Sequence, residues 1–212
     1  MGISFSRAVF AHLLIANRPF FKKSESFFEP GPDHQKEHSS YFHLESHGIE
    51  GPIKTVYSKQ YGASHSHWHP TLHKLGIETN RSHFSGSNVG AWTSLTSVDP
   101  ASRKRSYSAV EYYAPNASRP NLVVLTGAIA REIMLENKGK FWRAIGVKFV
   151  AGGVEFRAKA SRETIVCAGS VQSPQLLELS GIGIPEILKA ANIETKVTNL
   201  NVGENFQEHM SA

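Results

Sequence analysis

Residues 167–183 read CAGSVQSPQLLELSGIG, the most specific pattern in the chain. The apolar run Thr164–Ala168 (TIVCA) leads into it and predicts a strand buried on both faces. A corner of small residues follows, and Ser173-Pro174 suits the N-cap and first position of a helix that ends at the glycines of SGIG. Strand, small turn and helix often support a nucleotide, because a helix N-terminus favours anionic groups. An ordinary packed strand-to-helix turn fits the same residue types.

The forty residues before this pattern predict an antiparallel meander. Apolar and polar residues alternate over 145–150 and 154–158, and glycine-containing turns stand at 137–139 and 152–153. Ile129–Leu135 is predicted to be the preceding strand of this meander, and Asn121–Thr126 (NLVVLT) a further strand. A second short helix is predicted at Pro185–Ala191.

The N-terminal half differs in composition and lacks this regular alternation. Residues 33–120 are rich in His, Ser and Gly without sustained periodicity, so they predict loop with one strand at Ile53–Tyr57. Short helices are expected at 20–28, before Pro30-Gly31-Pro32, and at 71–76 and 106–112. The predicted fold class is α/β with α+β character, divided into a helical lead-in (1–32), a loop-rich region (33–120) and a C-terminal region (121–212).

Composition excludes several classes of protein. The 212 residues are 40% hydrophobic with a net charge of +5, which argues against a disordered chain and against dedicated nucleic-acid binding. No apolar run reaches the roughly 18 residues that span a bilayer. Cys167 is the single cysteine, so a disulfide framework is excluded, and we expect it to be a small buried apolar residue.

The N-terminal sequence does not decide the cellular compartment of the protein. Arg7 precedes an apolar stretch, Ala8–Ala16, which has some features of a signal peptide but equally suits an amphipathic helix. Asn80-Arg81-Ser82 and Asn116-Ala117-Ser118 are glycosylation sequons. These features permit secretion without establishing it.

The segment from Gly169 to Gly183 resembles the second signature of the glucose–methanol–choline (GMC) oxidoreductases. The matching positions are Gly169-Ser170, Ser173-Pro174, Leu176-Leu177 and Ser180–Gly183. Further stretches resemble fungal members such as the aryl-alcohol oxidases: Asn88–Trp92, Arg105–Ala109, Ala114-Pro115, Arg119–Leu122, Leu125–Gly127 and Asn201–Asn205. The resemblance covers roughly residues 50–212, with Phe21–Glu25 as a shorter match before it.

This resemblance implies an FAD-dependent oxidation of CH–OH donors, in which hydride passes to the flavin and a histidine near the family's C-terminus takes the hydroxyl proton. FAD and a small alcohol are the implied partners, and the oligomeric state is left open. Residues 121–212 would be part of the FAD-binding domain, and 33–120 would be substrate-domain or lid material. The implied cofactor-binding residues are Ala130, whose backbone faces the adenine, the corner Ala168, Gly169 and Ser170, and Ser173 and Pro174, which shape that corner.

Three features of the family do not occur in this sequence: the G-x-G-x-x-G dinucleotide fingerprint, the first family signature and the C-terminal His–His or His–Asn pair. We therefore expect an internal piece of a GMC protein that carries no catalytic residue and is inactive alone. The alternative is a non-catalytic remnant or interaction module that needs a partner chain, because unpaired strand edges attract partners.

Other candidate sites are set aside. His65, His67 and His69 would share one face of a strand and suit zinc or copper there, but we expect a solvated loop and no metal. His209 is expected to be structural, and Arg103–Arg105 to form a solvated turn.

Overall fold

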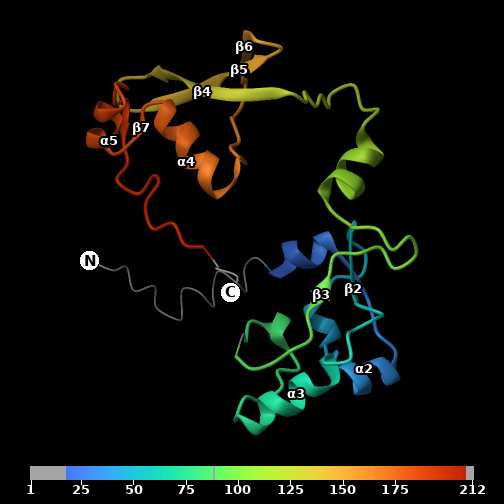
Figure 1. The fold of residues 1–212 in the computed structure, drawn as a ribbon. Helices are drawn as coiled ribbons and strands as arrows, with labels where there is room; N and C mark the ends of the chain where they lie inside the picture. Colours follow the sequence, from blue (N-terminus) through green and yellow to red (C-terminus); the bar gives the residue numbers. More distant parts are fainter. Residues whose placement is uncertain (1–17, 88, 209–212) are drawn as a thin grey trace. The chain divides into compact units, whose positions relative to one another are not determined.

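The computed structural model describes residues 18–87 and 89–208, which divide into two compact units (Figure 1). Unit 1 extends to Val123 and unit 2 begins at Val124. The signal-like stretch before residue 18, and His209, lie outside the described residues. Among the described helices, none combines the length and apolar character needed to cross a membrane.

Unit 1 is organised by a small mixed sheet. Strand β2 (Ile53–Tyr57) lies in the middle, parallel to β1 (Glu25–Phe28) and antiparallel to β3 (Leu95–Thr96). The predicted strand at Ile53–Tyr57 is confirmed with its bounds. The helix predicted over 20–28 is partly wrong: residues 18–24 are helical, but the last four residues, ESFF, form β1 because they pair with β2.

Helix α2 (Pro32–His38) and the first six residues of α3 (His65–Lys74) occupy parts of unit 1 for which the sequence predicted loop. The shorter helical segments are η1 (Leu44–Ser46), η2 (His83–Ser85), the π-helix η3 (Ala109–Tyr113) and η4 (Ala114–Asn116). The helices predicted at 71–76 and 106–112 are thus present with shifted bounds, since α3 starts six residues earlier and η3 starts three residues later.

The three alternate histidines lie on α3, so the expected solvated loop is wrong. A helix separates His67 from His65 and His69, because residues two apart point in different directions. His69 is buried, with Nδ1 3.1 Å from Thr79 Oγ1 and Nε2 3.2 Å from Thr93 Oγ1. No group of three or more metal-ligating side chains is arranged around an ion site in the described parts of the chain.

Unit 2 contains the predicted meander. Strands β4 (Ala128–Asn137), β5 (Trp142–Ala151) and β6 (Val154–Lys159) form an antiparallel sheet in that order. The strands predicted at 129–135, 145–150 and 154–158 and both turns are therefore confirmed.

Helix α4 (Gly169–Leu179) packs against β4, on one side of the meander (Figure 1). Strand β7 (Ile182–Gly183) follows, then α5 (Pro185–Ala190) and β8 (Val197–Thr198), which pairs parallel to β7. The second short helix predicted from Pro185 is confirmed, one residue shorter than expected.

Two predicted strands are absent. Residues 121–126 and 164–168 pair with no strand among the described residues. A strand that is buried on both faces lies within a sheet covered on both sides, and no described strand of unit 2 pairs with residues 164–168 to form such a sheet. Ile165 is consequently 74% exposed, and Cys167, expected to be buried, is also exposed.

Ser173 is not the N-cap of α4. The helix begins one turn earlier, at Gly169, whose φ of +88° lies in the left-handed region that glycine adopts without strain. Pro174 consequently lies inside the helix. The Ser173 hydroxyl still serves this end of the helix, because it accepts a 3.1 Å hydrogen bond from the backbone N–H of Ala168.

Candidate functional site

A cleft of about 360 Å³ lies between β4 and α4 in unit 2. The strand contributes four consecutive residues, Ala128–Arg131, and the helix contributes the side that faces it. The helical lining residues recur three or four positions apart, as one face of a helix requires: Ala168, Gln172, Gln175, Leu176 and Leu179.

A β-bulge explains why neighbouring strand residues share this cleft. Ala130 pairs with Phe149 and Glu132 pairs with Lys148, so Arg131 is an extra residue without a partner on β5. In regular pleating Arg131 would point away from the face that carries Ala130. The bulge lets both residues line the cleft.

Ser180 fastens the helix to the strand beside this cleft. Its side chain is fully buried, and its Oγ accepts a 2.7 Å hydrogen bond from the Ile133 N–H while donating a 2.6 Å bond to the Leu176 carbonyl. The hydroxyl therefore links the end of α4 directly to β4 and fixes the width of the cleft.

Glu132 forms a second link on the same strand. It pairs with Lys148 of β5 and, at 3.4 Å, with Lys196. The hydrogen bond from Lys148 holds the pKa of the Glu132 carboxyl below its usual range.

The structure brings together only some of the residues predicted to bind cofactor. Ala130 and Ala168 line the same cleft. Ser170, Ser173 and Pro174 instead line a larger hollow of about 870 Å³ on the other face of α4, opposite residues 199–207. Gly169 lines neither hollow and supplies the turn that starts the helix.

The cleft combines apolar walls with a few polar groups. Arg131 is its single titratable lining residue, and the amides of Gln172 and Gln175 can each donate and accept hydrogen bonds. Sequence reasoning missed all three polar residues. Among the described residues no acid or imidazole lines the cleft, so it offers a bound group one cation, two amides and apolar walls.

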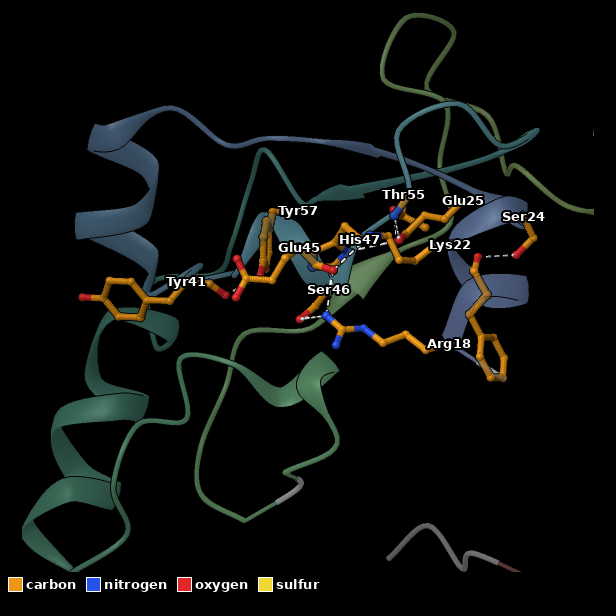
Figure 2. A network of polar contacts seen from close by, with 12 residues as sticks. Arg18, Lys22, Ser24, Glu25, Tyr41, Glu45, Ser46, His47, Thr55 and Tyr57 are labelled. Atoms are coloured by element: carbon orange, nitrogen blue, oxygen red, sulfur yellow. Dashed lines mark hydrogen bonds and ion pairs between the residues drawn. The ribbon is translucent and has the colours of Figure 1, made fainter. Parts of the chain in front are cut away.

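Unit 1 holds a second candidate, a polar network centred on Glu25 (Figure 2). The carboxylate accepts hydrogen bonds from the Thr55 hydroxyl at 2.7 Å, the Gly48 N–H at 3.0 Å and His47 Nδ1 at 3.1 Å. Burial alone would raise the pKa of Glu25, but these bonds outweigh it and hold the pKa below its ordinary value. Because its oxygens are occupied, Glu25 ties β1 to β2 and to the loop at residue 47, which is a structural role.

A cleft of about 470 Å³ adjoins this network and is lined by His83 and Phe84 together with Arg18, Phe21 and Ile53. His83 stacks on Trp92 at 5.3 Å between ring centroids, and neither ring nitrogen has a partner among the described residues. Burial lowers the pKa of His83 to about 4, with a smaller contribution from the charge of His47. The imidazole is therefore neutral near pH 7, and together with Phe84 it forms an uncharged wall of the cleft.

Comparison with known proteins identifies the family. The model of the GMC oxidoreductases matches residues 20–211, nearly the whole chain. The chain belongs to the GMC oxidoreductase family.

Several curated relatives of this GMC chain are fungal proteins that are much longer than it. It is 38% identical over 200 residues to the dehydrogenase mpl7 of Monascus purpureus, a match that covers 92% of this chain and 31% of the relative. It is 34% identical over 193 residues to the GMC oxidoreductase family protein Mala s 12 of Malassezia sympodialis, covering 90% of this chain and 31% of that protein. The GMC chain thus spans about a third of the length of these relatives.

Solved structures agree on the fold. The chain matches an FAD-dependent oxidoreductase from Chaetomium thermophilum with a TM-score of 0.80 at 24% identity, over 89% of this chain and 33% of that one. It matches a fungal aryl-alcohol oxidase with a TM-score of 0.76 at 24% identity, over 85% of this chain and 30% of that one. The mixed α/β fold expected from the GMC resemblance is therefore confirmed.

Proposed function

We propose that this chain is part of an FAD-dependent oxidoreductase that oxidises the CH–OH group of a small alcohol, and that the cleft between β4 and α4 holds the adenine end of FAD. The observation that carries the proposal is the meeting of Ala130 and Ala168 in one cleft, because these two residues were matched to the family's cofactor side from separate parts of the sequence.

The residues of the cleft fit an adenine nucleotide. Its volume of about 360 Å³ lies at the lower end of the range of roughly 300–1,000 Å³ typical of ligand pockets, which suits part of a dinucleotide rather than all of it. Apolar walls at Ile129 and Leu176 suit the faces of a purine, and the nearby amides suit its edge. Arg131 supplies a cation for a phosphate, and none of the described residues that line the cleft is a carboxylate that would repel one.

The chemistry that FAD supplies when bound is acceptance of a hydride from the alcohol carbon. This chain's residues bind and orient: the backbone of Ala128–Arg131 faces one side of the cleft, and α4 closes the other. Ser180 holds strand and helix at a fixed separation through its two hydrogen bonds. This cleft is proposed to bind the cofactor without taking part in proton transfer, because no side chain able to take a proton lines it among the described residues.

The test separates adenine binding from flavin binding. AMP and FMN are titrated separately into the purified chain, and binding is followed by calorimetry and by hydrogen exchange. We expect AMP to protect residues 128–131 and 168–175 from exchange, because these segments line the cleft, and FMN to leave them unchanged. Protection by FMN without protection by AMP would overturn the assignment of the cleft to adenine.

A matched pair of substitutions sharpens this test. Ala130→Leu places three extra carbons in the cleft and should weaken AMP binding about tenfold or more. Ala191→Leu makes the same change at an exposed position after α5 and should leave AMP binding unchanged. Equal effects of both substitutions would contradict the proposal.

The alternative, an interaction module that requires a partner chain, is favoured by apolar side chains on the surface of unit 2. Ile129, Phe141, Ile165 and Val171 each expose more than half of their area. Strong binding of a hydrophobic dye, lost when a partner chain is added, would support this function. A purified chain that melts cooperatively and binds no dye would exclude it.

A further inference from the structure

Strand β6 is the outer strand of the meander, and all six of its residues are exposed. β5 pairs with one of its edges, and no other described strand pairs with the opposite edge. A row of unpaired backbone N–H and C=O groups on such an edge is a template for another strand.

The register identifies which residues present these groups. Val154 pairs with Ala151 across a two-residue turn, and the N–H of Ala160 donates to the carbonyl of Ile145 at 2.9 Å. Even-numbered residues of β6 therefore direct their backbone groups to β5. Because backbone direction alternates along a strand, those of Glu155, Arg157 and Lys159 point outward.

The side chains on this strand separate by face. Val154, Phe156 and Ala158 lie on one face, where Phe156 stacks on Phe149 of β5 with ring centroids 5.6 Å apart. Glu155 and Arg157 lie on the other face, with their charged groups 3.9 Å apart and more than half exposed. The residues whose backbone groups point outward are thus one acid, Glu155, and two bases, Arg157 and Lys159.

We propose that the outer edge of β6 pairs antiparallel with the same edge of a second copy of this chain, with Phe156 opposite its counterpart. This register places Glu155 of each copy opposite Arg157 of the other, in the positions whose outward backbone groups exchange hydrogen bonds. The result is a continuous six-stranded sheet with a two-fold axis at Phe156.

Charge complementarity selects this register. Shifting the pairing by two residues in one direction sets Glu155 against Glu155. Shifting it in the other direction pairs Glu155 with Lys159 but sets Arg157 against Arg157, whereas the proposed register has no like-charge contact. Like charges directly opposite each other are unfavourable, whereas opposite charges stabilise a cross-strand pair. Phe156 falls in a non-hydrogen-bonded pair, in which opposite side chains come closest, so the two rings cover each other at the seam.

The inference does not depend on the proposed oxidoreductase activity, and sedimentation velocity over a range of protein concentrations tests it. We expect a reversible dimer that weakens as salt is added, because its specificity rests partly on exposed charge pairs. Glu155→Arg and Arg157→Glu should each raise the dimer dissociation constant about tenfold or more, since each creates two like-charge contacts. The double variant E155R/R157E exchanges the charges and should restore the dimer.

Two further variants keep the result unambiguous. Glu163→Arg makes the same charge change at an exposed residue after the sheet and should leave the dimer intact. Arg157→Pro removes an outward N–H without touching the bonds to β5, which edge strands tolerate, and should abolish the dimer while circular dichroism shows a folded chain. A chain that stays monomeric at every concentration, or a dimer that survives both Glu155→Arg and Arg157→Pro, would overturn the proposal.

Cross-linking checks the register itself. In a Cys167→Ser background, Phe156→Cys should form a disulfide between copies under mild oxidation, because opposite residues in such a pair have Cβ atoms about 4.5–5.5 Å apart. Val154→Cys should not form one, since this register sets it opposite Ala158. A disulfide that forms at residue 154 and not at 156 would refute the register.

Discussion

Units 1 and 2 bury different kinds of side chain. Most of the buried residues of unit 1 are polar, namely Ser40, His47, His69, His83, Thr93 and Ser106, beside Phe27, Tyr57 and Ala91. Those of unit 2 are mostly apolar, namely Ile133, Leu176, Leu188 and Val202, with Ser180 as the single polar member among the described residues. A polar core depends on each hydrogen-bond partner, because an unpaired buried group loses its water without compensation. Unit 1 should therefore respond more strongly than unit 2 to loss of one partner and to pH.

The largest effect is expected from Glu25→Ala in unit 1. This change removes the acceptor of bonds from His47, Thr55 and Gly48 and should cost about 3–5 kcal/mol of the unfolding free energy of unit 1. Urea unfolding measures the loss, and Trp142→Phe leaves Trp68 and Trp92 as fluorescent reporters within this unit.

Glu45→Ala is the matched control for this acid. Its carboxylate is exposed, and its one partner in the described part of the chain is an exposed His43 at 3.6 Å, so the loss should stay below about 0.5 kcal/mol. Equal losses for the two glutamates would remove the distinction between a buried network and a surface pair.

The next largest effect is expected at acidic pH, where unit 1 should lose stability before unit 2 does. The folded pKa of His83 is about 4, below its ordinary value of 6.5, so the unfolded chain binds the proton first. The stability that His83 contributes is complete above pH 6.5 and falls as pH drops from 6.5 towards 4, by about 3 kcal/mol in all. The lowered pKa values of His65 and His69 act in the same direction.

Unit 2 should respond in a different pH window. The pKa of Glu132 in this unit is lowered from its ordinary value of 4.5. The ionised Glu132 therefore stabilises unit 2 above pH 4.5, and this stability is lost only as the pH falls below that value. Urea midpoints measured between pH 7 and 5 should fall for the unit 1 reporters and stay level for Trp142 in a Trp68→Phe/Trp92→Phe chain. Parallel loss in both units over this range would contradict the comparison.

The contrast between a polar core in unit 1 and an apolar core in unit 2 also explains which helices and strands could be predicted from the sequence. The meander of unit 2 was predicted because regular alternation and glycine turns report an apolar face. Helix α2 and the first six residues of α3 were missed because their sequences, PDHQKEH and HSHWHP, carry no apolar stripe, and α3 is held by polar contacts such as those of His69. The strand predicted at 164–168 was wrong because an apolar run specifies burial only when neighbouring strands are present.

Only some of the residues that line the candidate site could be predicted from the sequence, for similar reasons. Ala130 and Ala168 followed from the family motif and meet in the cleft. Arg131 was missed because a bulge is invisible in an alternation pattern. Gln172 was missed because α4 was expected to begin at Ser173, and a residue before a helix has no face to share with Gln175.

Loss of the buried Ser180 hydroxyl in unit 2 is the next effect in size. Ser180→Ala leaves the buried N–H of Ile133 without its acceptor and should cost about 2 kcal/mol. Hydrogen exchange should show the opening at β4 and α4, and AMP binding should weaken with it. Ser161→Ala, at an exposed position, is the control and should change neither. An unchanged exchange rate at Ile133 would show that this hydroxyl does not fasten the helix.

The smallest effect comes from a pair of glycines that separates backbone strain from ligand binding. Gly139 and Gly169 have φ of +78° and +88°, and a Cβ at either meets no atom within 4 Å. Alanine at either position should therefore cost a similar free energy, about 1 kcal/mol, through backbone strain alone. Gly139 lies in the turn between β4 and β5, whereas Gly169 sets the direction of the first turn of α4 beside Ala168. If the cleft binds adenine, Gly169→Ala should weaken AMP binding more than Gly139→Ala at equal loss of stability, as measured by calorimetry and urea unfolding. Equal affinities would mean that the glycine corner serves the fold and not the ligand.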